Sequence, residues 1–229
     1  MKVKLIVILG ILLILASLAN AQEKPVLKDQ KDKVSYILGT DIGNNLKKQS
    51  ISVNPKILAK GIEDALAGAK PLLTDQEIQE TMMAFQKEVM AKQAEVAKKN
   101  KAEGEAFLAE NKKKEGVKTT PSGLQYKVIK PGKGKKPKSS DTVTVNYRGT
   151  LIDGTEFDSS YKRGQPATFQ VSGVIPGWTE ALQLMEEGAK WQLFIPSNLA
   201  YGERGAGGVI GPNATLIFEV ELLSIQEKK

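Results

Sequence analysis

The last 110 or so residues of this 229-residue chain carry a set of aromatic and apolar side chains, and the chain contains no His and no Cys. A Ser-His-Asp triad, a Cys nucleophile and a metal site built from His or Cys are therefore excluded by composition. The aromatic and apolar residues instead suggest a pocket that works by shape and by excluding water. The residues of interest are Tyr147, Phe157-Asp158, Val174–Trp178, Tyr201-Gly202 and Phe218.

These residues fall within five short motifs that follow one another along the chain. The motifs are Val145–Gly149, Phe157–Ser160, Val174–Trp178, Ala200–Gly202 and Phe218–Leu222. Their order and spacing resemble those of FKBP-type peptidyl-prolyl isomerases. Several separate motifs spread over about half of the chain make this resemblance specific.

The resemblance implies a role for each residue of the predicted site. Trp178 would form the pocket floor, and Ile210 would overhang the rim. The Tyr201 hydroxyl and the Ile175 backbone N–H would hold substrate carbonyls, while Asp158, close to Tyr147, would be the polar group that faces the twisting amide. The walls would be Tyr147, Phe157, Val174, Ile175 and Phe218. Asp158, Tyr201 and Tyr147 are thus the predicted catalytic residues. Taken singly, Tyr147, Phe157 and Phe218 fit an ordinary core position better than a site, and Trp178 fits either equally well.

Prolyl isomerisation suits such a pocket. Rotation about a peptide bond costs roughly 18–20 kcal/mol because resonance is broken. The twisted transition state carries less charge on its oxygen, so an apolar pocket favours it over the hydrated planar amide. Aromatic faces also fit the proline ring. No covalent step, metal or other cofactor is implied.

Two departures from the family pattern bear on ligand choice. Ala167 stands where many relatives have an aromatic wall residue, with Phe169 two positions later, which predicts a wider pocket on that side. The Gly205–Gly208 stretch leaves the loop after Tyr201 nearly free of side chains. Both changes weaken the expectation of macrolide inhibitor binding more than that of isomerase activity. Trp191 matches no pocket position and is predicted to be core.

The N-terminus has the features of a secretory signal. Lys2 and Lys4 precede an apolar run over 5–18, and small residues precede a cleavage point after Ala21. The run of about 14 residues is short of the roughly 20 that span a bilayer, although an uncleaved anchor is the alternative. Without Cys, a lipoprotein anchor is not expected. The sequence thus predicts export, to the periplasm or the outer cell surface.

Charge gives little indication of a nucleic-acid partner. The net charge is +7, and removal of the leader leaves 31 basic against 26 acidic side chains, a net charge of +5. Lys residues cluster at 112–114 and 130–138, where no aromatic residues interleave to stack on bases. Solvated loops are the simpler interpretation, with an anion-binding patch as the alternative.

Helical patterns fill the region before the predicted isomerase domain. A first helix carries the stripe Val34, Leu38, Ile42 and Leu46. A second should begin at Asn54-Pro55, with Asn as the cap, and end near Gly68. Thr74–Glu77 matches a capping box and predicts a third helix from Asp75 to about Lys114, some 60 Å long, with Gly104 as the position where it could bend or weaken.

After Gly116 the apolar period changes to two, which indicates strands. Val143, Val145 and Tyr147 alternate with polar neighbours. Asp153-Gly154 predicts a hairpin turn. The second alternating run is Leu216, Phe218, Val220 and Leu222. Residues 177–185 read as one short helix with Trp178, Leu182 and Met185 on one side.

The predicted fold class is therefore α+β, with a twisted antiparallel sheet wrapped around one short helix and preceded by an all-α region with a long connector helix. The predicted division is a signal peptide at 1–21, a helical dimerisation domain at 22–72, a connector helix at 73–115 and an FKBP-type isomerase domain at 116–229. The helical region resembles that of exported dimeric members of the macrophage infectivity potentiator type.

The helical region leaves two functional alternatives open. Its short amphipathic helices need a partner, which favours a homodimer over a monomeric helical bundle. The group Met82, Met83 and Met90 fits a core or dimer seam, although Met also suits promiscuous surfaces. The predicted function is a prolyl isomerase that assists folding of exported proteins, with unfolded or proline-containing polypeptides as clients. The alternative is a holdase that binds unfolded clients through the helical region; nothing in the residues addresses a role at a host surface.

Overall fold

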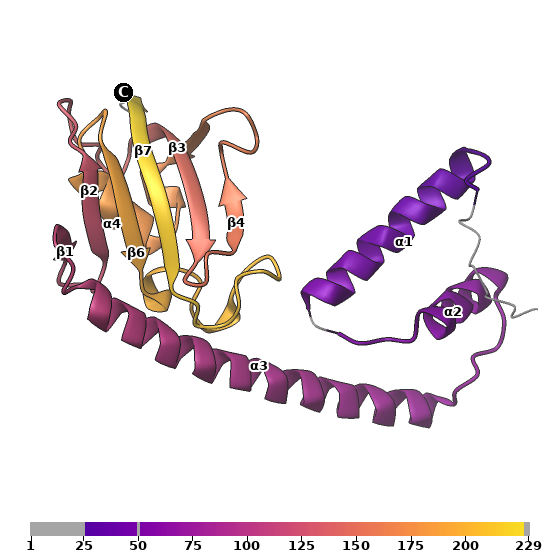
Figure 1. Cartoon of the computed structure of the whole chain (residues 1–229). Coiled ribbons are helices and arrows are strands. Elements are labelled where there is room, and N and C mark those ends of the chain that lie inside the picture. Colours follow the sequence, from indigo (N-terminus) through magenta and orange to yellow (C-terminus); the bar gives the residue numbers. More distant parts are fainter. Residues whose placement is uncertain (1–25, 50, 227–229) are drawn as a thin grey trace, which may run out of the picture. The chain divides into compact units, whose positions relative to one another are not determined.

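The computed structural model describes residues 26–49 and 51–226, so the predicted signal peptide at 1–21 lies outside the described residues. The chain divides into two units, Met1–Asn44 and Asn45–Lys229. Figure 1 shows the helices α1 to α3 in indigo to magenta and the C-terminal sheet in magenta to yellow. No helix among the described residues is long and apolar enough to cross a membrane.

The first two helices are short and have no buried residue. Helix α1 spans Gln30–Lys48 and α2 spans Pro55–Ala67. The Asn54 side chain accepts hydrogen bonds from the first N–H groups of α2, and Gly68 ends the helix in the left-handed conformation, with a φ of 64°. The predicted start and end signals of α2 are thereby confirmed.

Helix α3 is a single continuous helix over Asp75–Asn111. The predicted capping box is confirmed, because Thr74 accepts from the Glu77 N–H while the Glu77 carboxylate accepts from the Thr74 N–H. The helix ends at Asn111, a few residues before the predicted limit. Gly104 does not interrupt it and is buried against Thr215.

A seven-stranded antiparallel sheet forms the C-terminal part of the chain (Figure 1). The strand order is β1-β2-β6-β7-β3-β4, and β5 pairs with the first part of β3. The strands are β1 (Val117–Thr119), β2 (Gln125–Lys130), β3 (Thr142–Leu151), β4 (Glu156–Ser159), β5 (Ala167–Gln170), β6 (Lys190–Ile195) and β7 (Leu216–Gln226). The predicted α+β architecture is confirmed.

The core lies between the sheet and the short helix α4, which spans Pro176–Leu184. Alternate residues of β3 and β7 face it, as the period of two predicts. On α4 the buried side is the predicted one, with Trp178 and Leu182 followed by Met185 just beyond the helix. Trp191 is buried and stacks on Tyr126, with ring centroids 4.3 Å apart, as predicted for a core residue.

The Asp153-Gly154 turn joins β3 to β4 as predicted. The Leu151 N–H donates to the Thr155 carbonyl at 2.9 Å, and Gly154 has a φ of 87°, which favours glycine. This hairpin brings Phe157 and Asp158 back alongside the Tyr147 strand.

Candidate active site

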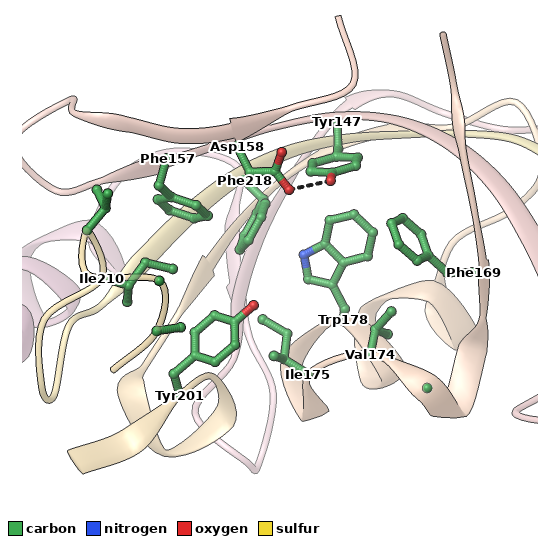
Figure 2. Close-up of a pocket in the computed structure, with 14 residues that line it drawn as sticks. Tyr147, Phe157, Asp158, Phe169, Val174, Ile175, Trp178, Tyr201, Ile210 and Phe218 are labelled. Carbon is green, nitrogen blue, oxygen red and sulfur yellow. Dashed lines mark hydrogen bonds between the residues drawn. The ribbon is translucent and has the colours of Figure 1, made fainter. Parts of the chain in front are cut away.

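All nine residues of the predicted site line one cavity of about 610 Å³, together with Phe169 and small residues of two loops. Figure 2 shows the labelled side chains facing this common space. They come from β3, β4, the turn before α4, α4 itself, the loop after β6, and β7. The nine are Tyr147, Phe157, Asp158, Val174, Ile175, Trp178, Tyr201, Ile210 and Phe218.

Trp178 is the centre of the aromatic cluster. Its ring meets those of Tyr147 and Phe218 at centroid distances of 5.2 Å, with interplanar angles of 90° and 81°. Phe169 meets it at 5.8 Å and 85°. Edge-on contacts of this kind are each worth about 0.5–1.5 kcal/mol beyond the area they bury, so the indole is held in one orientation.

A β-bulge explains how the neighbours Phe157 and Asp158 both line the cavity. Successive side chains in a strand normally point to opposite faces. Here Gly149 pairs with Asp158 and Thr150 pairs with Glu156, which leaves Phe157 as the extra residue on β4. The bulge turns Phe157 toward Phe218, with ring centroids 5.4 Å apart.

Gly149 makes room for this pair of rings. A Cβ at Gly149 would lie 2.6 Å from the Phe157 ring and 2.7 Å from the Phe218 ring, closer than packed atoms approach. The absence of a side chain at this buried strand position therefore allows two pocket rings to meet over the backbone.

Phe169 supplies an aromatic wall beside Ala167. Both residues lie on β5 two positions apart, so they share a face of the sheet. Phe169 contacts both Trp178 and Tyr147 and lines the cavity, whereas Ala167 does not. A ring therefore borders the pocket on the side where the sequence predicted a wider opening.

Tyr147, Asp158 and Arg163 form a hydrogen-bonded cluster at one edge of the site. The Tyr147 hydroxyl donates to the Asp158 carboxylate at 2.5 Å (Figure 2). Arg163 donates to the same carboxylate and, at 2.7 Å, to the Tyr147 hydroxyl oxygen. Its guanidinium also lies over the Tyr147 ring, 5.3 Å from the centroid.

Arg163 was missed by sequence reasoning. It lies in the turn after β4, five residues beyond Asp158, within a segment that has no apolar period and no family motif. A basic residue shortly after a predicted site carboxylate was the one available signal.

The cluster keeps Asp158 ionised. Partial burial of the carboxyl raises its pKa, but the hydrogen bonds from Tyr147 and Arg163 outweigh burial, so the pKa of Asp158 lies below its ordinary value. Burial, together with the hydrogen bond to Asp158, raises the pKa of the Tyr147 hydroxyl. The pair therefore stays as a neutral phenol and a carboxylate throughout the physiological range.

The loop after Tyr201 closes the cavity on one side. Ala206 and Ile210 exchange backbone hydrogen bonds of 2.8 and 3.0 Å, so this segment is a small hairpin. Gly207 and Gly208 form its turn at φ values of 58° and 70°, which explains the glycine-rich sequence. Ile210, the last residue of this hairpin, is buried and lines the cavity.

The floor also carries an unsatisfied donor. The indole N–H of Trp178 is buried and has no hydrogen-bond partner among the described groups. In Figure 2 the indole nitrogen faces the space between Ile175 and Phe218. Apart from the Asp158 cluster and the Tyr201 hydroxyl, the labelled lining is otherwise apolar.

Comparisons with known proteins agree with this geometry. Residues 133–223 match the model of the FKBP-type peptidyl-prolyl cis-trans isomerase family, and residues 31–128 match that of the domain amino-terminal to such isomerases. The chain is 52% identical to outer membrane protein MIP of Legionella longbeachae, with 99% of each chain covered. The chain belongs to the FKBP-type peptidyl-prolyl cis-trans isomerases.

Two further relatives support this assignment of the FKBP-type isomerase. This chain is 45% identical to peptidyl-prolyl cis-trans isomerase Mip of Coxiella burnetii over the whole of both chains. The crystal structure of FkpA from Escherichia coli matches with a TM-score of 0.62 at 46% identity, covering 88% of this chain and 99% of that one. The prediction of an FKBP-type prolyl isomerase is confirmed.

The ionised state of Asp158 predicts a flat pH profile. The contribution of the Asp158 carboxylate to activity is fully present above the ordinary Asp pKa of about 3.9. It is lost only as the pH falls through the pKa of Asp158 in the folded protein, which is lower still. Because the chain has no His, kcat/KM should be constant within about twofold between pH 5 and 8.

Removal of the Arg163 guanidinium should raise the pKa of Asp158, because one of the hydrogen bonds that offset the effect of burial is lost. Arg163→Ala is expected to shift the acid limb of the kcat/KM profile to higher pH than in the unsubstituted protein. The carboxylate assignment would be contradicted by a titration between pH 5 and 7 in the unsubstituted protein, or by an acid limb that does not move in the variant.

Proposed function

We propose that this FKBP-type isomerase accelerates prolyl rotation by seating the proline ring on Trp178 and holding the twisted amide in a nearly dry pocket. The observation that carries the proposal is the apolar cavity with one buried indole surrounded by three edge-on rings. Such a floor matches the flat, apolar pyrrolidine ring in shape and in polarity.

The rate enhancement would come from differential binding. A planar amide carbonyl is strongly hydrated, and the apolar lining offers little to replace that water. The twisted amide has lost conjugation and carries less charge on its oxygen, so it loses less on entering the pocket. The pocket thereby lowers the barrier without forming a bond to the substrate.

The few polar groups would orient the substrate. The Tyr201 hydroxyl and the Ile175 N–H are proposed to donate to substrate carbonyls flanking the prolyl bond. Asp158 would face the twisting amide, and Tyr147 and Arg163 would hold its carboxylate in place through the hydrogen bonds already described. Tyr147 would thus act both as a wall and as a support for Asp158.

The cellular setting is proposed to be outside the cytoplasm. The apolar N-terminal run and the small residues before Gln22 support an exported protein, as does the name of the relative, outer membrane protein MIP. The periplasm or the outer surface would then be its location, and unfolded or proline-containing exported polypeptides its clients.

The ring of Phe169 beside Trp178 also supports binding of a macrolide inhibitor.

We further propose that the N-terminal region, residues 22–72, forms a homodimer and that residues 73–115 connect it to the isomerase domain at 116–229. Neither α1 nor α2 buries a residue in the single chain. Ile37 on α1 and Ile57 on α2 are 56% and 66% exposed. Helices in proteins gain most of their stability from packing of an apolar face, so a second copy of the chain is the partner that would cover these faces.

The isomerase site can be tested with the full chain and a Leu-Pro or Phe-Pro peptide. Asp158→Ala combined with Tyr201→Phe should lower kcat/KM by about 10- to 100-fold, as expected for the loss of one charged and one neutral hydrogen-bonding group. Tyr161→Phe is the matched control because Tyr161 is exposed, lies outside the cavity, and should retain full activity.

Two results would contradict the assignment. The first is absence of isomerisation by the correctly folded parent protein, which would favour a pocket that only binds. The second is equal activity of the double variant and the Tyr161→Phe control. Circular dichroism and thermal melting verify that all three proteins are folded.

Light scattering tests the dimer. The unsubstituted protein should have the mass of two chains, and Ile62→Glu on α2 should shift it toward one by placing a charge on the apolar face. Lys56→Glu, on the same helix, adds a negative charge at a polar position and should remain dimeric. A monomeric parent protein that still suppresses aggregation of unfolded clients would instead favour the holdase function, in which the exposed apolar faces bind clients directly.

A further inference from the structure

Helix α3 contacts the loop that borders the prolyl pocket. The Asn100 side-chain Nδ2 donates a hydrogen bond of 2.8 Å to the backbone carbonyl of Pro212, 112 residues away in sequence. The contact is partly buried. Pro212 lies two residues after Ile210, which lines the cavity. We name residues 205–212 the rim loop.

The rim loop lies close to α3 at Gly211, where a larger residue would displace the Asn100 amide. A Cβ at Gly211 would lie 2.9 Å from Asn100 Nδ2 and 3.4 Å from Val96 Cγ1. These two helix residues, one turn apart, therefore form a surface on which the backbone of the loop rests. The sequence feature that permits the contact is the Gly211-Pro212 pair.

The helix itself is fixed to the sheet on the C-terminal side of this contact. Asn111 donates to the Gln125 side chain at 3.0 Å, and Gln125 donates to the Leu108 carbonyl at 2.9 Å. Both side chains are buried. Phe107 packs on Phe194 of β6, with ring centroids 6.0 Å apart. Loss of this anchorage would leave buried polar groups unsatisfied, so the last turns of α3 move with the sheet.

Gly104 allows α3 to pack closely against Thr215. A Cβ at Gly104 would overlap the Thr215 hydroxyl and lie 3.2 Å from the Thr215 Cβ. Thr215 directly precedes β7, the strand that carries Phe218. The helix is thus held against both ends of the segment that runs from the rim loop into the pocket wall.

Backbone hydrogen bonds link the rim loop to the residues that line the pocket. Ala206 and Ile210 pair through two backbone hydrogen bonds, and Asn213 donates its N–H to the Gly202 carbonyl at 2.8 Å. A displacement of Pro212 would therefore move Ile210 and the loop following Tyr201 together.

We propose that α3 is a brace for the rim loop and that Asn100 is a positioning residue of the prolyl site, acting through Pro212 and Ile210 without touching substrate. The proposal rests on the isomerase function proposed above. Its consequence is that substrate affinity depends on a residue of the connector helix. The brace preorganises the rim, so its loss should weaken binding more than it slows rotation of bound substrate.

The test uses full-length Asn100→Ala, Asn100→Asp and the control Lys98→Ala. Lys98 lies on the same helix and is exposed, and Ala favours helix at both positions, so weakening of α3 itself is not introduced. Asn100→Ala should raise KM about three- to tenfold, the fold-change expected for one hydrogen bond, with kcat within about twofold. Asn100→Asp should have a larger effect because it places a carboxylate oxygen against the Pro212 carbonyl.

Hydrogen exchange provides a readout that is independent of activity. The amides of Ala206 and Ile210 should exchange faster in both Asn100 variants than in Lys98→Ala, while those of β3 and β7 stay protected. Unchanged exchange in the rim loop, or a fall in kcat with KM unaltered, would overturn the proposal. If the unsubstituted protein lacked isomerase activity, the proposed function would fail, and the exchange rates would still decide whether the brace exists.

Discussion

The edge-on packing around Trp178 is the interaction on which the C-terminal domain depends. The indole is the point where β3, β5, β7 and α4 meet, since its ring partners come from all three strands and it is itself carried by the helix. Only the face toward the cavity is left for a ligand. The hydrophobic core and the binding floor are therefore one structure, and the rigidity that packing gives the core is passed to the site.

The other features of the site follow from the need to keep this floor apolar while admitting a peptide. The β4 bulge turns Phe157 toward the cavity, and the bare backbone at Gly149 lets its ring meet that of Phe218. The charged groups are confined to one edge, where Asp158 is compensated by Tyr147 and Arg163. An uncompensated carboxylate would draw water into the pocket, whereas this cluster satisfies it within the protein.

The sequence was sufficient for features that depend on local periodicity or capping. The Asn54 cap, the Thr74–Glu77 box, the Asp153-Gly154 turn and the alternation in β7 each correspond to a local physical rule, and all were found as predicted. The set of cavity residues was also anticipated, but through the order of family motifs. No periodicity in the sequence would have separated Trp178 from Trp191, which are both buried.

Features set by long-range approach could not be read from the sequence. From the sequence alone, Gly104 predicts a bend or a weak point, because that is the usual local effect of a glycine in a helical run. Its actual partner, Thr215, lies more than a hundred residues away. The same holds for the contact of Asn100 with Pro212 and for the bulge that turns Phe157 and Asp158 to one side. Each depends on which strands and helices become neighbours after folding.

The central claim is that rotation is accelerated by desolvation and positioning, with no proton transferred in the rate-limiting step. The most direct test is the solvent deuterium isotope effect on kcat/KM for a Leu-Pro peptide, with viscosity-matched controls in light water. Desolvation predicts a ratio close to one, since no bond to an exchangeable hydrogen is broken. A normal effect of about two or more would mean that a proton moves in the transition state, and Asp158 or Tyr201 would then have to act as a general acid or base.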